Sequence, residues 1–170
     1  MDQYEFNPNR QPEEALVAIG VASLSIAQIE DQVRNAIAGL AEIDYELGGA
    51  MTTHIPFQTC LDILLTMGDV ALAKPEPQNT LKKLVSTLKD ANKRRNKLVH
   101  RQLATRERDN TLHFIVRSAR GSFVVSTEKT SVRALQADAA AIYKASMELQ
   151  SFISIHKLEP PFEMHRELKR

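Results

Sequence analysis

The chain has 170 residues, of which 43% are hydrophobic and 25% are charged, and its formal net charge is +1. This composition is typical of a globular protein with one core, and the near-zero net charge of the whole chain indicates neither a nucleic-acid binder nor a membrane-surface binder. A single cysteine, Cys60, excludes an internal disulfide framework and a zinc site of the multi-cysteine kind, and its apolar neighbours indicate a small core residue.

Residues 1–11 are expected to form an irregular arm, and their polar, acidic sequence does not resemble a secretory signal. A helix is predicted to start at Pro12, because Pro and the acidic pair Glu13-Glu14 suit the first turn of a helix. A heptad-like stripe then runs for about 33 residues, up to Gly48-Gly49. The stripe consists of Ile19, Ala22, Ile26, Ile29, Val33, Ala36, Leu40, Ile43 and Leu47. A helix of this length indicates a bundle or a dimer interface.

Two further helices are predicted in the middle of the chain. The second runs from about Pro56 to Leu72, and a connector with two prolines follows at residues 73–80. The third runs from Asn79 or Thr80 to about Leu103. Its apolar stripe is Leu81, Leu84, Val85, Leu88, Ala91, Leu98 and Val99.

The last third of the chain mixes two periodicities. After a polar break, β-branched runs at about 111–117 and 121–127 predict a β-hairpin, and a fourth helix is expected from Ser131 to about Lys157. We therefore expect an all-α fold, an up-and-down bundle of four main helices with a small β-hairpin inserted at about 111–127. The bundle domain would cover residues 12–157, with residues 158–170 as a tail.

No run of about 18 apolar residues is present, so we expect a cytoplasmic protein with no membrane-spanning segment and no membrane partner. Charge is nevertheless segregated along the chain. Residues 1–50 hold nine acidic and two basic side chains, whereas residues 74–108 hold eleven basic and three acidic ones. This segregation predicts either a local anion-binding face or complementary contact between segments or subunits.

The basic segment contains the stretch RRNKLVHR at residues 94–101. On a helix with about 100° per residue, Arg95, Asn96 and His100 share one side, and Asn96 and His100 are neighbours four residues apart. Arg95 falls on the apolar stripe in line with Val99, so its guanidinium needs a partner. A carboxylate, a helix C-terminus or a bound phosphate could fill that role.

The remaining cations of this stretch point to the flanks of the helix and are expected to be solvated: Lys93, Arg94, Lys97 and Arg101. The simplest interpretation is a wet helix end, since the helix dipole favours cations in the last turn. A second arginine–histidine pair, Arg108 and His113, spans a turn and a strand, and we interpret it as a coincidence with His113 on a solvent face. The five histidines lack metal-ligand spacing, so no metal and no cofactor is expected.

The residues RNKLVH, 95–100, resemble the signature of the HEPN superfamily, an arginine, a polar residue and then a histidine on a late helix of a small helical bundle. The resemblance implies a metal-independent endoribonuclease that forms a homodimer with one composite cleft. His100 would transfer protons during attack of the ribose 2′-OH on the adjacent phosphate. Arg95 would bind the phosphate and Asn96 would orient the histidine or the phosphate. The basic side chains of Lys93, Arg94, Lys97 and Arg101 would attract the RNA backbone without sequence preference.

The same resemblance leaves several functions open. A toxin, defence or stress effector with a protein antitoxin or regulator is one, although Gln102 replaces the tyrosine that one toxin branch carries two residues after the histidine. A non-catalytic HEPN-like dimer that binds a nucleotide, RNA or a protein is the second. An unrelated four-helix adaptor with a protein interface is the third. No specificity for DNA is inferred for any of them.

Overall fold

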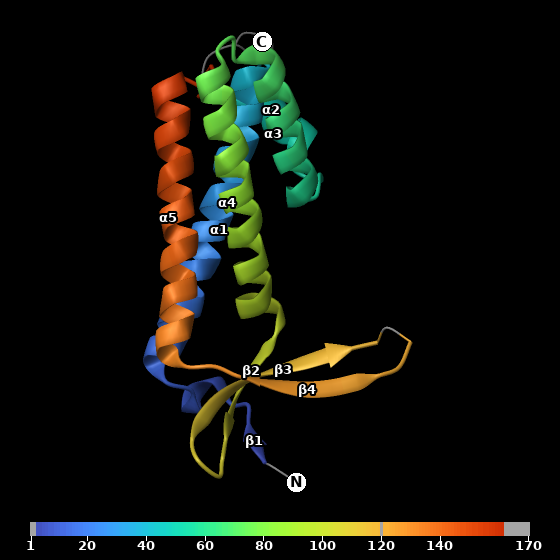
Figure 1. Cartoon of the computed structure of the whole chain (residues 1–170), viewed down its shortest axis with the longest axis vertical. Helices are drawn as coiled ribbons and strands as arrows, with labels where there is room; N and C mark the ends of the chain where they lie inside the picture. The colour runs from blue at the N-terminus through green and yellow to red at the C-terminus, as the bar shows by residue number, and fades with distance from the viewer. Residues whose placement is uncertain (1–2, 120, 162–170) are drawn as a thin grey trace, which may run out of the picture. The chain divides into compact units, whose positions relative to one another are not determined.

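The structure is a computed structural model that describes residues 3–119 and 121–161 (Figure 1). Within these residues it has five α-helices and one four-stranded antiparallel sheet. The prediction of a mainly helical fold is therefore confirmed, whereas a four-stranded antiparallel sheet is present where a small hairpin was predicted. The chain groups into two compact units, residues 1–25 with 92–143, called the first unit, and residues 26–91 with 144–170, called the second unit.

The bounds of the elements follow the labels of Figure 1. The helices are α1 (Glu13–Leu40), α2 (Tyr45–Thr52), α3 (Phe57–Ala71), α4 (Pro75–His100) and α5 (Val132–His156), with a short 3-10 helix η1 (Pro8–Arg10). The strands are β1 (Tyr4–Glu5), β2 (Gln102–Arg106), β3 (Thr111–Ser118) and β4 (Val124–Lys129). The three longest helices, α1, α4 and α5, each contribute residues to both units.

The single long first helix of the prediction is wrong, because the chain breaks after α1 and continues as α2. Glu42 adopts a left-handed backbone conformation with φ 54°, which ends the helical path. The carboxylate of Asp44 then accepts a hydrogen bond from the backbone N–H of Leu47 at 2.9 Å and caps α2. Gly48-Gly49 therefore lies inside α2, where a Cβ on Gly48 would come within 2.4 Å of Ala38 Cβ.

The second unit also holds α3 and most of α4. α3 matches its predicted range within one residue at each end, and Cys60 is buried there as expected. α4 starts earlier than predicted, at Pro75, because proline is tolerated in the first turn of a helix. The Gln78 side-chain amide closes the connection between the two helices, donating to the carbonyls of Asp69 at 2.9 Å and Leu72 at 2.8 Å.

The sheet of the first unit corrects the prediction at the N-terminus and after α4. The arm of residues 1–11 holds β1 and η1, and β2 occupies residues predicted as helix end and polar break. The strand order is β1-β2-β3-β4, with every neighbouring pair antiparallel. Gln11 is buried and ties the arm to the sheet. Its side-chain amide donates to Glu5 O at 3.1 Å, and its carbonyl oxygen accepts from the Thr105 hydroxyl at 2.9 Å.

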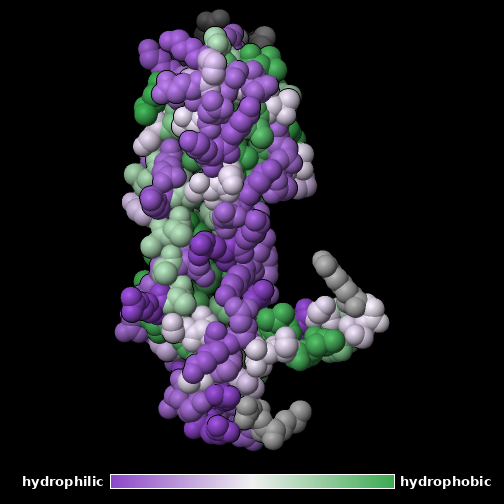
Figure 2. Space-filling view, in the orientation of Figure 1, coloured by the Kyte–Doolittle hydropathy of each residue, from purple (hydrophilic) through white to green (hydrophobic). Residues whose placement is uncertain are grey.

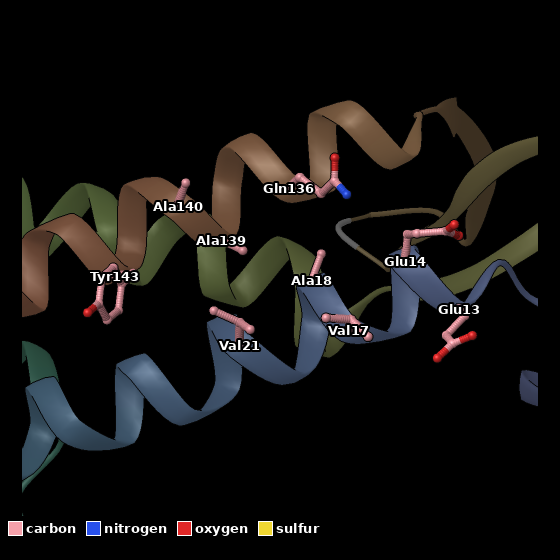
Figure 3. A pocket seen from close by; sticks show the side chains of 9 residues that line it. All are labelled: Glu13, Glu14, Val17, Ala18, Val21, Gln136, Ala139, Ala140 and Tyr143. Atoms are coloured by element: carbon pink, nitrogen blue, oxygen red, sulfur yellow. The ribbon is translucent and has the colours of Figure 1, made fainter.

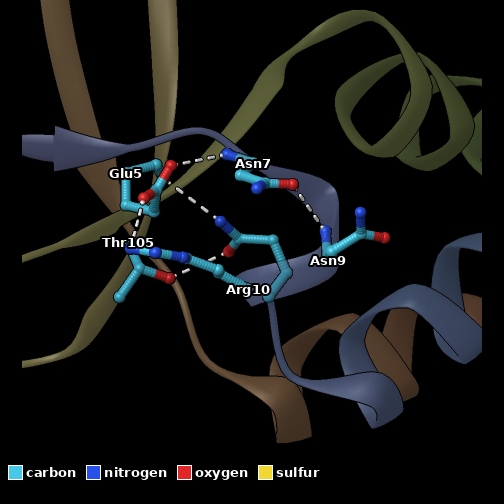
Figure 4. Close-up of polar contacts among 6 residues, drawn as sticks. Glu5, Asn7, Asn9, Arg10 and Thr105 are labelled. Carbon is cyan, nitrogen blue, oxygen red and sulfur yellow. Dashed lines mark hydrogen bonds and ion pairs between the residues drawn. The ribbon is translucent and has the colours of Figure 1, made fainter.

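A surface network surrounds this anchor (Figure 4). The Glu5 carboxylate accepts from the backbone N–H of Asn7 at 2.8 Å and pairs with Arg10 at 3.2 Å. The hydrogen bond from Asn7 and the nearby charge of Arg10 lower the pKa of Glu5. The Asn7 side chain in turn caps η1 by accepting from Asn9 N at 3.0 Å. These contacts hold the arm in a defined path against β2.

The hairpin of β3 and β4 has two different halves. The inner half of β3, residues 112–115, is buried, whereas β4 is exposed from residue 124 to residue 127. His113 is buried at 5% exposure, so its predicted place on a solvent face is wrong. Its ring stands edge-on to Tyr4 at 5.6 Å, and Nε2 lies 2.9 Å from the Thr111 hydroxyl.

α5 follows its prediction closely, because its apolar repeat is long and its first turn is capped. The Ser131 hydroxyl accepts from Ala134 N at 3.2 Å, which fixes the start of the helix. Its predicted stripe is buried at Leu135, Ala139, Ile142, Ser146, Leu149 and Ile153. The predicted tail of residues 158–170 falls in part, at residues 162–170, outside the described residues.

Among the described residues, α1 has the length and hydropathy of a helix that could cross a membrane. Core helices of proteins in water pass the same test, and α1 carries a fully buried stripe that includes Ala22, Ile29 and Val33. This single helix is therefore weak evidence for a membrane span, and the expected absence of a membrane partner stays a prediction.

Candidate functional site

The candidate site lies on the last two turns of α4, within the first unit. The side chain of Leu98 is 2% exposed and fixes this end of the helix to the core, while Asn96 and His100 are exposed. His100 is the last residue of α4, and β2 begins at Gln102. The core contact of Leu98 and the sheet pairing of β2 thus set the direction in which the motif faces solvent.

The structure brings Arg95, Asn96 and His100 into contact. Nη1 of Arg95 donates to Oδ1 of Asn96 at 3.1 Å and lies 3.2 Å from Nε2 of His100. A guanidinium can only donate, so Nε2 of His100 accepts in this contact when the imidazole is the neutral tautomer with its proton on Nδ1. The cluster therefore combines a fixed cation with a ring nitrogen that is able to take up a proton.

Arg95 is half-buried, as expected for a residue in line with the apolar stripe. Its Nε atom is buried and has no hydrogen-bond partner among the residues that the structure describes. Within residues 3–119 and 121–161, no carboxylate pairs with this guanidinium, whose side-chain contacts are those to Asn96 and His100. A half-buried positive charge without a counter-ion favours binding of an anion.

The flanking cations differ from the expectation of a simple solvated rim. Arg94 forms an ion pair with Asp138 of α5, and Lys97 lies 2.5 Å from Glu128 of β4. Arg101 pairs with the other carboxylate oxygen of Glu128. Three of the four predicted RNA-binding side chains are thus held by acidic residues of the same unit, which weakens their attraction for a further anion.

Glu128 pairs with two of these cations, Lys97 and Arg101. Hydrogen bonds donated by Lys97 and, to a smaller extent, by Arg101 lower the pKa of its carboxyl group below the ordinary value of 4.5. Lys97 also stands over the ring of Phe114, with its Nζ 5.6 Å from the ring centroid. The end of α4 is therefore tied to the inner part of the β3–β4 hairpin.

Sequence reasoning missed Asp138 and Glu128 as partners of the basic stretch. Asp138 is 44 residues from Arg94, and Glu128 is 27 residues from Arg101. Neither acidic residue carries a local motif, so only the pairing of β3 with β4 and the packing of α5 reveals them. The remaining flanking cation, Lys93, is exposed.

The other residues with chemical potential lie in different surroundings. The thiol of Cys60 is buried, and burial raises its pKa, which makes the thiolate less available. His156 packs its ring against Phe152 at 4.4 Å in the second unit. Among the described residues, no group of three or more His, Cys, Asp or Glu side chains is arranged to hold a metal ion.

An apolar groove on the first unit is a separate surface feature (Figure 3). Its volume is about 380 Å³, and α1 and α5 supply its walls. Figure 3 shows the carboxylates of Glu13 and Glu14 at one end and the ring of Tyr143 at the other. Val17, Ala18, Val21, Gln136, Ala139 and Ala140 complete the lining. None of the motif residues lines this groove.

Comparison of the chain with protein-family models, with curated proteins and with solved structures finds no match. The function must therefore be argued from the residues of the site and their geometry.

Proposed function

We propose that this protein is a HEPN-like, metal-independent endoribonuclease that acts as a homodimer in the cytoplasm. The observation that carries the proposal is the contact of Arg95 with Asn96 and with Nε2 of His100 on an exposed helix face. The arrangement of α1, α3, α4 and α5 as an up-and-down bundle is part of the proposal. A role as a toxin, defence or stress effector, with a protein antitoxin or regulator, belongs to it as well.

The chemistry assigns one task to each side chain. Neutral His100 takes the proton of a ribose 2′-OH through Nε2, and the 2′-oxygen attacks the adjacent phosphorus. Arg95 stabilises the negative charge that develops on the phosphate oxygens, and Asn96 orients the histidine or the phosphate by hydrogen bonding. The bond from phosphorus to the 5′-oxygen breaks, that oxygen takes up a proton from water, and His100 returns its proton to the solvent. The products are a 2′,3′-cyclic phosphate and a free 5′-OH.

The test is cleavage of a mixed pool of single-stranded RNA by the purified chain in EDTA. We expect cleavage that leaves 2′,3′-cyclic phosphate ends, and we expect His100→Ala to slow it by about 10²-fold or more, as loss of a general base does. His54→Ala is the matched control, because His54 is another exposed histidine, outside α4. Equal rates for the wild type and His100→Ala would refute the proposed role of His100.

The ion pairs around the motif favour one alternative, a non-catalytic HEPN-like dimer that binds a nucleotide, RNA or a protein. Arg94, Lys97 and Arg101 are all engaged by acidic residues of the same unit, as in a structural network. A binding assay with fluorescently labelled RNA separates the two functions. Binding of intact RNA that His100→Ala leaves unchanged, without cleavage of any substrate, would favour the non-catalytic module.

A further inference from the structure

The outer half of the β3–β4 hairpin, residues 116–118 and 123–127, is an exposed ribbon called here the outer hairpin. It projects from the rest of the first unit (Figure 1), and Figure 2 shows hydrophobic surface along it. Phe123 is 72% exposed, Val124 is 50% exposed and Val125 is 52% exposed. Large apolar side chains therefore gather where none of the described elements covers the two strands.

The apolar side chains occupy both faces of this ribbon. Side chains alternate along a strand, so within β4 Val125 projects to one face and Val124 to the other, and Phe123 directly precedes the strand. On that second face Val116 lies opposite Ser126 in the strand register and adds apolar surface. A two-stranded ribbon with water on both faces is at best marginally stable alone, so this arrangement favours a partner that covers it.

The edge of the sheet indicates the kind of partner. β4 is an edge strand, because the order of the sheet is β1-β2-β3-β4. Its outward N–H and C=O groups are a template for another strand, and natural proteins usually protect such an edge with charges or proline. Glu128 and Lys129 place charges only at the inner end of β4, whereas residues 122–127, with the sequence SFVVST, contain neither charges nor proline. The open edge therefore fits an extended polypeptide strand.

We infer that this strand is β4 of a second copy of the chain, paired antiparallel about a two-fold axis near Ser126. In this register Val125 lies opposite Thr127 of the partner subunit, and two β-branched side chains pack well across strands. Phe123 lies opposite Lys129 of the partner subunit, which suits a cation–π contact. Val124 lies opposite Glu128 of the partner subunit, and no like charges oppose one another in this register. The inference rests on the homodimer of the proposed function but not on RNA cleavage.

The first test is the mass of the full-length chain by light scattering after size exclusion, measured over a range of concentrations. The wild type should approach twice the chain mass of 19.1 kDa as concentration rises. Val125→Lys should weaken the dimer by at least about tenfold, because it places two cations beside the axis and blocks the edge. Val70→Lys is the control, because Val70 is 85% exposed on α3 and lies outside the hairpin. A wild type that stays monomeric, or a Val125→Lys variant that dimerises normally, overturns the inference.

The second test reads the register directly. Residues opposite each other across antiparallel strands have Cα atoms about 4.5–5.5 Å apart, within the range that a disulfide spans. Ser126→Cys should therefore form a disulfide-linked dimer under mild oxidation. Ser86→Cys, an exposed serine on α4, should not, and both variants keep the buried Cys60 as background. No cross-link at Ser126 refutes this register. An RNA-cleaving protein without the cross-link would retain the proposed function and lose only this interface.

Discussion

Glu128 binds two cations of the basic stretch, one from each side of the α4 terminus. Its carboxylate contacts Lys97 and Arg101, and its side chain remains 44% exposed. Such half-exposed pairs contribute little individually, about 0.2–1 kcal/mol, because water screens them. Their larger effect is on how strongly Lys97 and Arg101 can attract a further anion, since each ion pair neutralises positive charge beside Arg95.

The lowered pKa of Glu128 predicts a dependence of stability on pH. Because the folded value lies below the ordinary 4.5, the stabilising contribution is fully present above that value and is lost as pH falls through the folded pKa. Glu128→Gln should cost about 0.5–1 kcal/mol of unfolding free energy near pH 7. The difference from the wild type should shrink toward zero as pH falls through the lowered folded pKa of Glu128. Urea unfolding at a series of pH values from 7 downward measures this, and a difference that stays constant would contradict the prediction.

The residues of the motif could be predicted from the sequence, because a helix fixes which side chains share a face over five residues. Arg95, Asn96 and His100 accordingly meet in the structure. Their proposed catalytic roles stay predictions. The state of the flanking cations could not be predicted, because Asp138 and Glu128 reach them through packing and strand pairing. Sequence spacing carries no information about such long-range partners.

At the scale of elements, α1 carries two glycines in opposite surroundings. A Cβ on Gly39 would lie 2.1 Å from the carbonyl oxygen of Leu158, so the helix and the segment after α5 touch there through their backbones. A Cβ on Gly20 would meet no atom of the described residues within 4 Å. Substituting alanine at each glycine therefore separates the effect of close packing on stability from the effect of helix propensity.

Gly39→Ala should destabilise the protein by about 1–3 kcal/mol, because backbone atoms cannot move aside as a flexible side chain can. Gly20→Ala should stabilise it by about 0.5–1 kcal/mol, because alanine loses less conformational entropy in a helix. Urea unfolding followed by circular dichroism gives both values. Shifts of the same sign for the two variants would count against the close backbone approach at Gly39.

Elements defined by interactions between residues close in sequence were predicted more accurately than elements defined by distant pairing. α3 and α5 are set by local apolar periodicity, and their bounds agree within one or two residues. The prediction of one long first helix was wrong because the apolar heptad pattern continues without interruption from α1 into α2. Nothing in the local sequence indicates that Glu42 adopts the left-handed conformation that ends α1. β1 and β2 were missed because β1 has two residues and pairs with a strand about 100 residues away.

At the scale of the whole molecule, neither unit is a single stretch of chain. α1, α4 and α5 each begin in one unit and end in the other. Unfolding of one unit alone would therefore interrupt all three helices in the middle, which is unfavourable because helix formation is cooperative. Unfolding of the two units should be coupled through these shared helices.

Differential scanning calorimetry tests this coupling. We expect one transition in the wild type, and we expect Gly39→Ala in the second unit and Glu128→Gln in the first to lower the midpoint of that same transition. With about 0.7 kcal/mol of unfolding enthalpy per residue, a cooperative chain of this length should absorb roughly 120 kcal/mol. Two resolved transitions, with Gly39→Ala shifting only one, would show that the units unfold separately.

The contact between Arg95 and His100 has a consequence for any anion that approaches this face. Nη1 already donates to the imidazole, so a phosphate oxygen that takes that hydrogen competes with the ring for it. Arrival of the anion and release of the histidine would then be one exchange, in which the incoming group frees the base that acts on it. Without a bound anion, the imidazole of His100 would stay hydrogen-bonded to Arg95.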